Sequence, residues 1–411
     1  MRKFMKILNF LVFFLLLYGS LFAEEKNAKL EAYISENKKE QFKYDYQKIE
    51  KDSLKLRDSW ISPLRFNFNY NKSNPYGNEQ TSQNTAIKMD QTIFQSGGIY
   101  YGIKFAEASK IYSNYNMDMQ KRKLVKDAIS LLMQIKQTDL KIAKQKLKIK
   151  NSEINLEQKK EQYLSGQLDS GFLDNAVIER NIVIQMLYDI QTNKERVVSK
   201  FHVISDMDYK IASIPYLRML KKDDFLKHNI IMKMSQSDIE KNRYAKDVTV
   251  AKYLPRVNLV AGYNWDKTEN QQFGNTGASF SGDTSYYNYG LRASLPLDIN
   301  TFRDIEVSKL EYLKSKVVIE DKKKQLVAIY DQVMQNIENY DKKMKLSIEN
   351  KELYEKLLAD TQSLFEAGYK TEYDVNLLKN SVEIQRIDLK IFEIDKQLEL
   401  LTLYEMYKNE I

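Results

Sequence analysis

The residues that could perform covalent or metal chemistry are few in this sequence and poorly spaced for it. There is no cysteine, which excludes disulfides, thiolate metal sites and a cysteine nucleophile. The two histidines, His202 and His228, do not stand in a metal-ligand spacing such as H-E-x-x-H. Gly97-Gly98 lacks the Lys-Ser/Thr that a phosphate-binding loop requires. We therefore expect no catalytic residue, no metal and no cofactor, and the sequence predicts a protein that is not an enzyme.

The charged residues predict a solvated helical surface. The net charge is +8, from 64 Lys and Arg against 56 Asp and Glu. The cations are spread among acidic residues along long segments, whereas a nucleic-acid footprint needs clustered cations. We expect no nucleic-acid partner.

The first 23 residues have the layout of a secretory signal peptide. Arg2, Lys3 and Lys6 are followed by an apolar run, Ile7–Leu17, and small residues precede the polar sequence after Ala23. The apolar run is shorter than the roughly 20 residues of a membrane span, although an uncleaved anchor is the alternative. We expect an exported protein without a lipid anchor, because no cysteine is available to carry one.

The positions of glycine and proline divide the chain into long helical segments. Breaker-free stretches, rich in Lys, Glu, Gln, Leu and Ile, cover 103–165, 172–214, 216–254, 297–367 and 369–411. As helix, the first would be on the order of 95 Å long. Apolar residues recur every seven positions in two series, one through Ala128, Ile135 and Ile142 and the other through Met133 and Leu140. The two series lie on nearly opposite sides of one helix, which predicts a wall of helices with a neighbour on each side.

Two regions alternate between polar and apolar residues and predict strand hairpins. They lie at 64–94 and 256–296, and in the last strand Tyr287, Tyr289 and Leu291 share one face. Such alternation is typical of a wall between lipid and water. Four strands cannot close a transmembrane barrel, so this interpretation requires several copies of the chain.

The order of elements is repeated within the chain. Each long helix ends at an aromatic residue followed three positions later by glycine, at Gly166 and Gly368, which are 202 residues apart. We expect a first repeat at 24–214, with its helical tip near 164–172. A second repeat is expected at 215–411, with its tip near 366–374.

Three local patterns resemble those of the TolC-like outer membrane efflux protein family. They are Gln91-Thr-Ile-Phe-Gln-Ser-Gly-Gly98; Leu295-Pro-Leu297 with Arg303; and the tip motifs Tyr163-x-x-Gly166 and Phe365-x-x-Gly368-x-x-Thr371-x-x-Asp374-Val375. The resemblance implies a mostly α fold with β-strands: a homotrimer with a 12-stranded outer-membrane β-barrel, four strands per subunit, continued by a long periplasmic α-helical barrel. It also implies contact with outer-membrane lipid of a Gram-negative bacterium, and a periplasmic adaptor and an inner-membrane pump as partners.

The resemblance places two kinds of site at the helical tips. Adaptor docking is implied for Tyr163, Gly166, Phe365, Gly368 and Thr371. The entrance gate is implied for Asp374, Leu377, Phe172, Asp169 and Asp174. Asp374 matches an acidic ring of the family, but the family's second acidic position is Leu377 here, so a single charged ring combined with an apolar constriction is expected. Asp374 can equally serve as a helix N-terminal residue that stabilises the helix dipole.

The function implied is the exit channel of a tripartite efflux system that passes drugs or other small molecules to the exterior. One alternative keeps the fold and makes the chain the outer-membrane component of a type I protein secretion system. Another, of a different class, is a periplasmic coiled-coil scaffold that forms no pore.

Overall fold

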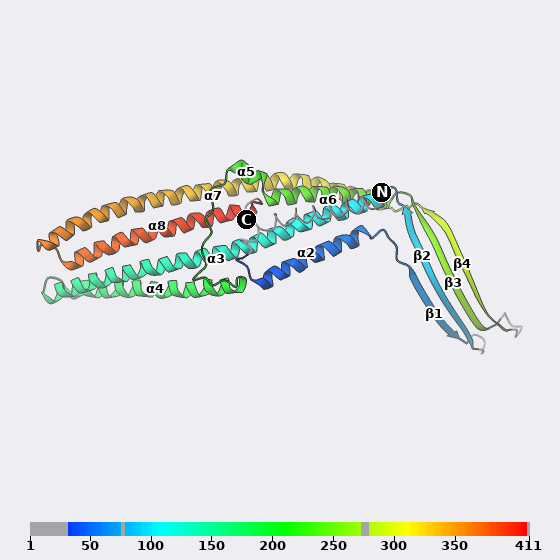
Figure 1. Ribbon diagram of the computed structural model, residues 1–411, viewed down its shortest axis with the longest axis horizontal. Coiled ribbons are helices and arrows are strands. Elements are labelled where there is room, and N and C mark those ends of the chain that lie inside the picture. The colour runs from blue at the N-terminus through cyan, green and yellow to red at the C-terminus, as the bar shows by residue number, and fades with distance from the viewer. Residues whose placement is uncertain (1–31, 75–78, 273–278, 409–411) are drawn as a thin grey trace, which may run out of the picture. The chain divides into compact units, whose positions relative to one another are not determined.

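A computed structural model describes residues 32–74, 79–272 and 279–408, so the expected signal peptide at 1–23 lies outside the described part. In chain order the elements are α2 (Glu36–Arg57), β1 (Arg65–Ser73), β2 (Gln80–Phe94), α3 (Gly98–Leu164), α4 (Ser170–Ile204), α5 (Lys222–Lys227), α6 (Ile230–Lys252), β3 (Arg256–Gln272), β4 (Ser279–Ser294), α7 (Thr301–Glu366) and α8 (Glu372–Met406). Figure 1 shows that a helix, a strand hairpin and a helical hairpin follow one another twice.

The duplication is visible in the lengths of the elements. Helices α3 and α7 have 67 and 66 residues, and α4 and α8 have 35 residues each. The chain divides into two compact units, and both repeats contribute to each. One unit holds the described residues within 1–44, 117–232 and 322–411, and the other holds those within 45–116 and 233–321.

The first unit is helical and contains the largest apolar core. Ile135 and Met133, one from each seven-residue series of α3, are fully buried, and so is Leu326 of α7. Tyr404 of α8 and Phe225 of α5 complete the same core. Burial of Met133 and Ile135, one from each series, shows that α3 has neighbours on two sides at this level. No helix in the described ranges is long and apolar enough to cross a membrane.

Helix α4 ends earlier than the sequence predicts. The breaker-free stretch runs to 214, but the helix stops at Ile204, and Ser205 is extended. The chain after it enters the core, where Leu217 is buried and its N–H donates to Gln397 Oε1 of α8 at 2.7 Å. Tertiary packing therefore overrides helix propensity in this segment. The stretch at 216–254 is likewise interrupted before α6, whose first turn is capped by Asn229 Oδ1 accepting from the N–H of Ile231 at 2.9 Å.

The second unit contains one antiparallel sheet with the strand order β1-β2-β3-β4. The strands of the second hairpin are long: β3 continues to Gln272, and β4 begins at Ser279. Most of the hairpin expected at 256–296 is therefore strand. Backbone pairing continues through these polar residues, with Asp266 opposite Thr284, since the ladder satisfies backbone groups whatever the side chains are.

The first family-like motif secures the start of the sheet. The side chain of Gln91 accepts from the N–H of Ser62 at 2.9 Å and donates to the carbonyl of Trp60 at 3.0 Å. Gly98, which begins α3, packs so closely that an added Cβ would lie 3.2 Å from Cβ of Ala251. The motif thus joins the segment before β1, the strand β2 and the first turn of α3.

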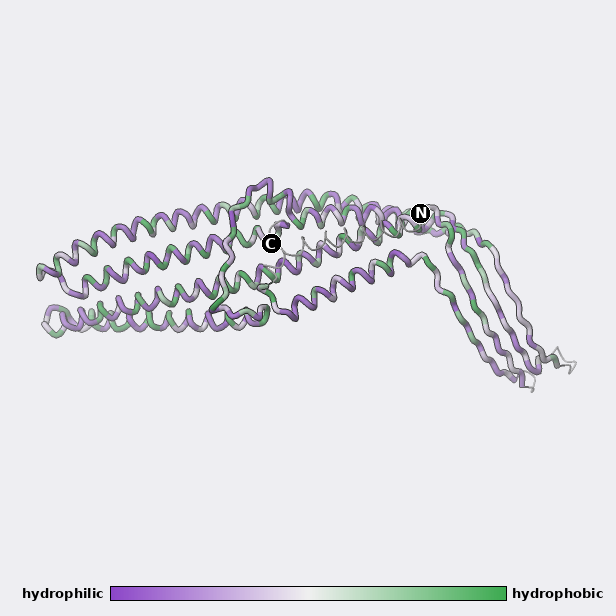
Figure 2. The backbone as a smooth tube through the Cα atoms, in the orientation of Figure 1, coloured by the Kyte–Doolittle hydropathy of each residue, from purple (hydrophilic) through white to green (hydrophobic). Residues whose placement is uncertain are grey.

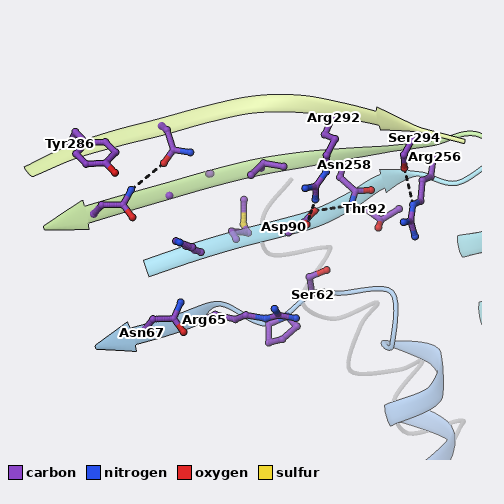
Figure 3. A pocket seen from close by; sticks show the side chains of 18 residues that line it. Ser62, Arg65, Asn67, Asp90, Thr92, Arg256, Asn258, Tyr286, Arg292 and Ser294 are labelled. Atoms are coloured by element: carbon purple, nitrogen blue, oxygen red, sulfur yellow. Dashed lines mark hydrogen bonds and ion pairs between the residues drawn. The ribbon is translucent and has the colours of Figure 1, made fainter. Parts of the chain in front are cut away.

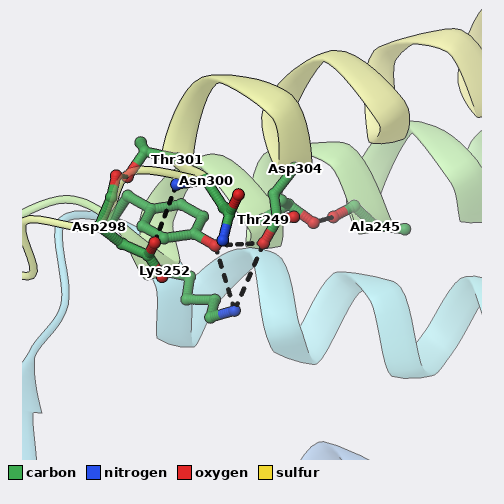
Figure 4. A network of polar contacts seen from close by, with 8 residues as sticks. Ala245, Thr249, Lys252, Asp298, Asn300, Thr301 and Asp304 are labelled. Atoms are coloured by element: carbon green, nitrogen blue, oxygen red, sulfur yellow. Dashed lines mark hydrogen bonds and ion pairs between the residues drawn. The ribbon is translucent and has the colours of Figure 1, made fainter.

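The turn from β4 into α7 is held by polar contacts (Figure 4). The carboxylate of Asp298 accepts from the N–H of Asn300 at 2.8 Å, and the hydroxyl of Thr301 donates to the carbonyl of Asp298 at 2.7 Å. The hydroxyl of Tyr253, just after α6, donates to Asp304 of α7. These contacts fix the direction in which α7 leaves the sheet.

Candidate functional site

Both long helices end in the same motif at the tips of the helical hairpins. Gly166 and Gly368 have φ of +74° and +81°, a region that L side chains rarely adopt. The N–H of Gly166 donates to the carbonyl of Tyr163 at 3.0 Å, and the N–H of Gln167 donates to the backbone carbonyl of Gln162 at 2.9 Å. The same pair of bonds recurs at Gly368, and this is a Schellman cap. Tyr163 and Phe365, at equivalent places in the last turns, are each 42% exposed.

The helices that leave the tips are also capped at equivalent positions. Asp169 caps α4, its carboxylate accepting from the N–H of Gly171 at 2.8 Å. Thr371 caps α8 and forms a reciprocal capping box with Asp374. Asp169 and Thr371 are 202 residues apart, like the two tip glycines, so the duplication extends to the caps.

Asp374 is engaged within its own helix terminus. Its carboxylate accepts from the N–H of Thr371 at 3.0 Å and from the Thr371 hydroxyl at 2.9 Å. The backbone hydrogen bond from Thr371 holds the pKa of Asp374 below its usual range, with the hydroxyl and nearby Lys370 acting in the same direction. The carboxylate is therefore ionised at neutral pH, and the structure supports the helix-capping interpretation directly.

The other expected gate residues lie on the first turns of α4 and α8. Phe172 is 52% exposed, Asp174 is exposed and Leu377 is half-buried. Phe172 occupies the position in the first repeat that Asp374 occupies in the second. Its aromatic ring thus stands where the second repeat has a carboxylate.

A series of polar contacts joins α3 to α8 and was not anticipated from the sequence. The hydroxyl of Tyr373 donates to Glu161 at 3.2 Å. Further along, three more contacts join the pairs Asn380–Asn151 (2.7 Å), Lys144–Asp388 (2.5 and 2.7 Å) and Gln137–Asp395 (2.5 Å). We call these four pairs the α3–α8 polar contacts.

The spacing of these residues contained a signal for the contacts. Gln137, Lys144 and Asn151 are seven residues apart, so they share one face of α3. They form a third seven-residue series, which is polar and stands two positions after the apolar series through Ile135 and Ile142. The sequence alone does not show which helix supplies the partners, and this is why the pairs were missed.

Asp395, one of the residues of the α3–α8 polar contacts, is a half-buried carboxylate of α8. Burial raises its pKa, against the opposing effect of the hydrogen bond from Gln137 and of the cations Lys141 and Lys343. A raised pKa means that the charged form is disfavoured in the folded chain. The contact between α3 and α8 at this level is therefore sensitive to protonation.

The sheet in the second unit has two unlike faces. One continuous row across all four strands is Phe66, Ile87, Tyr263 and Tyr287, and each of these side chains is about half exposed or more. The row beside it on the opposite face is Arg65, Lys88, Gly262 and Asn288. Figure 2 shows the resulting alternation of apolar and polar residues along the strands. An apolar face open to its surroundings, backed by a polar face, fits a wall between lipid and water.

Solved structures of outer membrane channels share this fold. The outer membrane protein VceC of Vibrio cholerae matches with a TM-score of 0.71 and 12% identity over 94% of this chain and 97% of that one. The Campylobacter jejuni CmeC outer membrane channel matches with a TM-score of 0.69 and 11% identity, over 94% of this chain and 87% of that one. The Neisseria gonorrhoeae MtrE outer membrane channel, solved in its open state, matches with a TM-score of 0.62 and 11% identity. The match covers 89% of this chain and 84% of that one.

The sequence match is narrower and agrees with the fold. Residues 223–407 match the sequence profile of the family described as outer membrane efflux protein. No curated protein sequence matches the chain. The chain therefore resembles the outer membrane efflux proteins in sequence over residues 223–407, and it shares the fold of solved outer membrane channels over nearly its whole length. The resemblance and the mostly α fold with four strands predicted from the sequence are thereby confirmed.

Proposed function

We propose that three copies of this chain form the exit duct of a tripartite efflux system in the outer membrane of a Gram-negative bacterium. Small molecules would pass through the duct, driven by an inner-membrane pump and delivered through a periplasmic adaptor. The protein would supply a passage and perform no chemistry. The relatives found by fold are channels, and this supports a transport role for the chain.

The two free edges of the sheet carry this proposal. In the order β1-β2-β3-β4, the outer sides of β1 and β4 have no strand partner within the described sheet. Unpaired backbone groups in lipid cost several kcal/mol each, roughly, so an open sheet with a lipid-facing side is unstable there. Pairing β4 of one copy with β1 of the next removes both edges, and three copies would close a barrel of twelve strands.

The helical tips are proposed as the entrance and as the adaptor-docking surface. Tyr163 and Phe365 are exposed aromatic side chains beside rigid glycine caps, and aromatic residues are favoured at protein interfaces. Three copies of Asp374 would place a ring of negative charge at the entrance, while Phe172 and Leu377 would provide the apolar constriction. The two roles of Asp374, capping and charge, are compatible.

The proposal is tested with the protein purified in detergent. We expect a trimer by light scattering, a barrel continued by a tube in electron micrographs, and ion conductance in planar bilayers. A monomer without conductance, recovered from the soluble periplasm, would support the coiled-coil scaffold and contradict a channel. Deletion that leaves drug susceptibility unchanged but abolishes export of a protein would favour type I secretion over efflux.

A further inference from the structure

The polar face of the sheet contains a groove with a surplus of positive charge. The groove has a volume of about 1080 Å³ and is lined from all four strands (Figure 3). Its charged residues are Arg65, Lys88, Arg256 and Arg292, with Asp90 as the sole carboxylate among the lining residues. We call this set the basic groove. All four basic side chains are exposed.

Only one of the four cations is neutralised by an ion pair. Asp90 is contacted by the guanidinium of Arg292 and accepts from the amide of Asn258 at 2.7 Å. Arg256 donates from Nε to the hydroxyl of Ser294 at 3.0 Å, a neutral partner. In the described part of the chain, Arg65, Lys88 and Arg256 have no carboxylate within ion-pair distance. Each copy therefore presents three uncompensated positive charges on this face.

Arg65 and Lys88 are placed against each other by the strand register. They are directly opposite partners on β1 and β2. Opposite positions on one face of an antiparallel pair bring side chains within about 5.5 Å at Cβ, and like charges there are destabilising. The following positions on this face of β1 are Asn67, Asn69 and Asn71, which shows that a polar wall can be built without charge. The repulsion between Arg65 and Lys88 is relieved when an anion lies between them.

We propose that the basic groove makes the strand region of the channel selective for anions, so that small inorganic and organic anions pass in preference to cations. This inference rests on the proposed function, because a ring forms only when copies of the chain surround a common passage. Rings of Arg and Lys produce anion selectivity in pores. The barrier to cations is electrostatic, because most residues that line the groove are polar or charged.

The test is the ratio of chloride to potassium permeability, measured from the reversal potential in planar bilayers under a KCl gradient. The Asp374→Asn variant, which lacks the acidic ring proposed at the entrance, is expected to give a ratio above one. The double variant Arg65→Gln/Lys88→Gln should lower it by about two-fold or more, since each neutralised side chain removes a charge facing the passage. Arg65→Glu/Lys88→Glu should reverse the preference. Asp90→Asn should raise the ratio, because it removes the only carboxylate and releases Arg292.

The matched control is Lys72→Gln, on the same strand as Arg65 but on the opposite face and outside the groove. Its ratio should equal that of wild type. A double variant with an unchanged ratio would overturn the inference and leave the channel function standing. Complete absence of conductance would instead remove the channel function, and the inference with it. Because Asp90→Asn changes the ratio in the opposite direction to Arg65→Gln/Lys88→Gln, misfolding cannot account for both results.

Discussion

Lys144 of α3 and Asp388 of α8 form an ion pair that joins the two repeats, with Nζ at 2.5 and 2.7 Å from the two carboxylate oxygens. Both side chains are largely shielded, at 25% and 14% exposure, so the pair is screened less than a surface pair. Asp388→Ala leaves an ammonium partly buried without its partner, and we expect a loss of about 1–3 kcal/mol in stability. If the α3–α8 polar contacts hold the entrance closed, conductance should also rise in planar bilayers.

The charge-exchanged variant Lys144→Asp/Asp388→Lys provides the control for that prediction. It keeps one positive and one negative side chain at the same two places, so it should recover part of the stability and of the wild-type conductance. Conductance that stays at the wild-type level in Asp388→Ala, despite lower thermal stability, would limit the pair to a structural role.

The tip glycines are predicted to be needed for their backbone conformation and not for space. No heavy atom lies within 4 Å of a Cβ added at Gly166 or Gly368, yet both have positive φ. Alanine at either position should cost about 1–2 kcal/mol. Gly102→Ala is the matched control: Gly102 lies inside α3 with the same open surroundings and without positive φ, so alanine there should stabilise by about 0.5–1 kcal/mol. Equal effects at the three positions, read from thermal unfolding in detergent, would contradict this account.

The sequence predicted those parts of the fold that depend on local pattern. Seven-residue spacing identified Ile135 and Met133 as core residues, and alternation placed Tyr287, Tyr289 and Leu291 on one exposed face. The end of α4 at Ile204 could not be predicted, because Leu217 and Gln397, which draw the following segment into the core, are 180 positions apart. The α3–α8 polar contacts were missed for the same reason. The gate and docking assignments at the tips remain predictions.

Asp395 is predicted to make the contact between α3 and α8 dependent on pH. Burial raises its pKa in the folded chain, so its contribution to stability is complete below the unfolded pKa, about 3.9, and is lost as pH rises through the folded value. Asp395→Asn removes the charge and keeps a side-chain oxygen for the hydrogen bond from Gln137. The variant should melt about 2 °C or more above wild type at neutral pH. Near pH 4 the two should melt together, and a constant difference across that range would be inconsistent with titration of this group.

Asp374 allows helix capping to be separated from pore charge, because its capping partner Thr371 is uncharged. Thr371→Ala removes the side chain that accepts from the N–H of Asp374 and leaves the carboxylate in place. Asp374→Asn removes the charge but keeps an oxygen that can accept from the N–H of Thr371. Thr371→Ala should therefore lower stability by about 1 kcal/mol with little change in selectivity, whereas Asp374→Asn should raise the ratio of chloride to potassium permeability.

The pH dependence of stability, compared between wild type and Asp374→Asn, gives a second, independent measurement of the capping role of Asp374. The pKa of Asp374 is lowered in the folded chain, so its stabilising contribution is present above the unfolded pKa of about 3.9 and is lost as pH falls through the folded value. Acid should therefore destabilise wild type more than Asp374→Asn. If Thr371→Ala and Asp374→Asn shift the permeability ratio equally, the entrance responds to the shape of the α8 terminus, and a ring of charge from Asp374 is excluded as its cause.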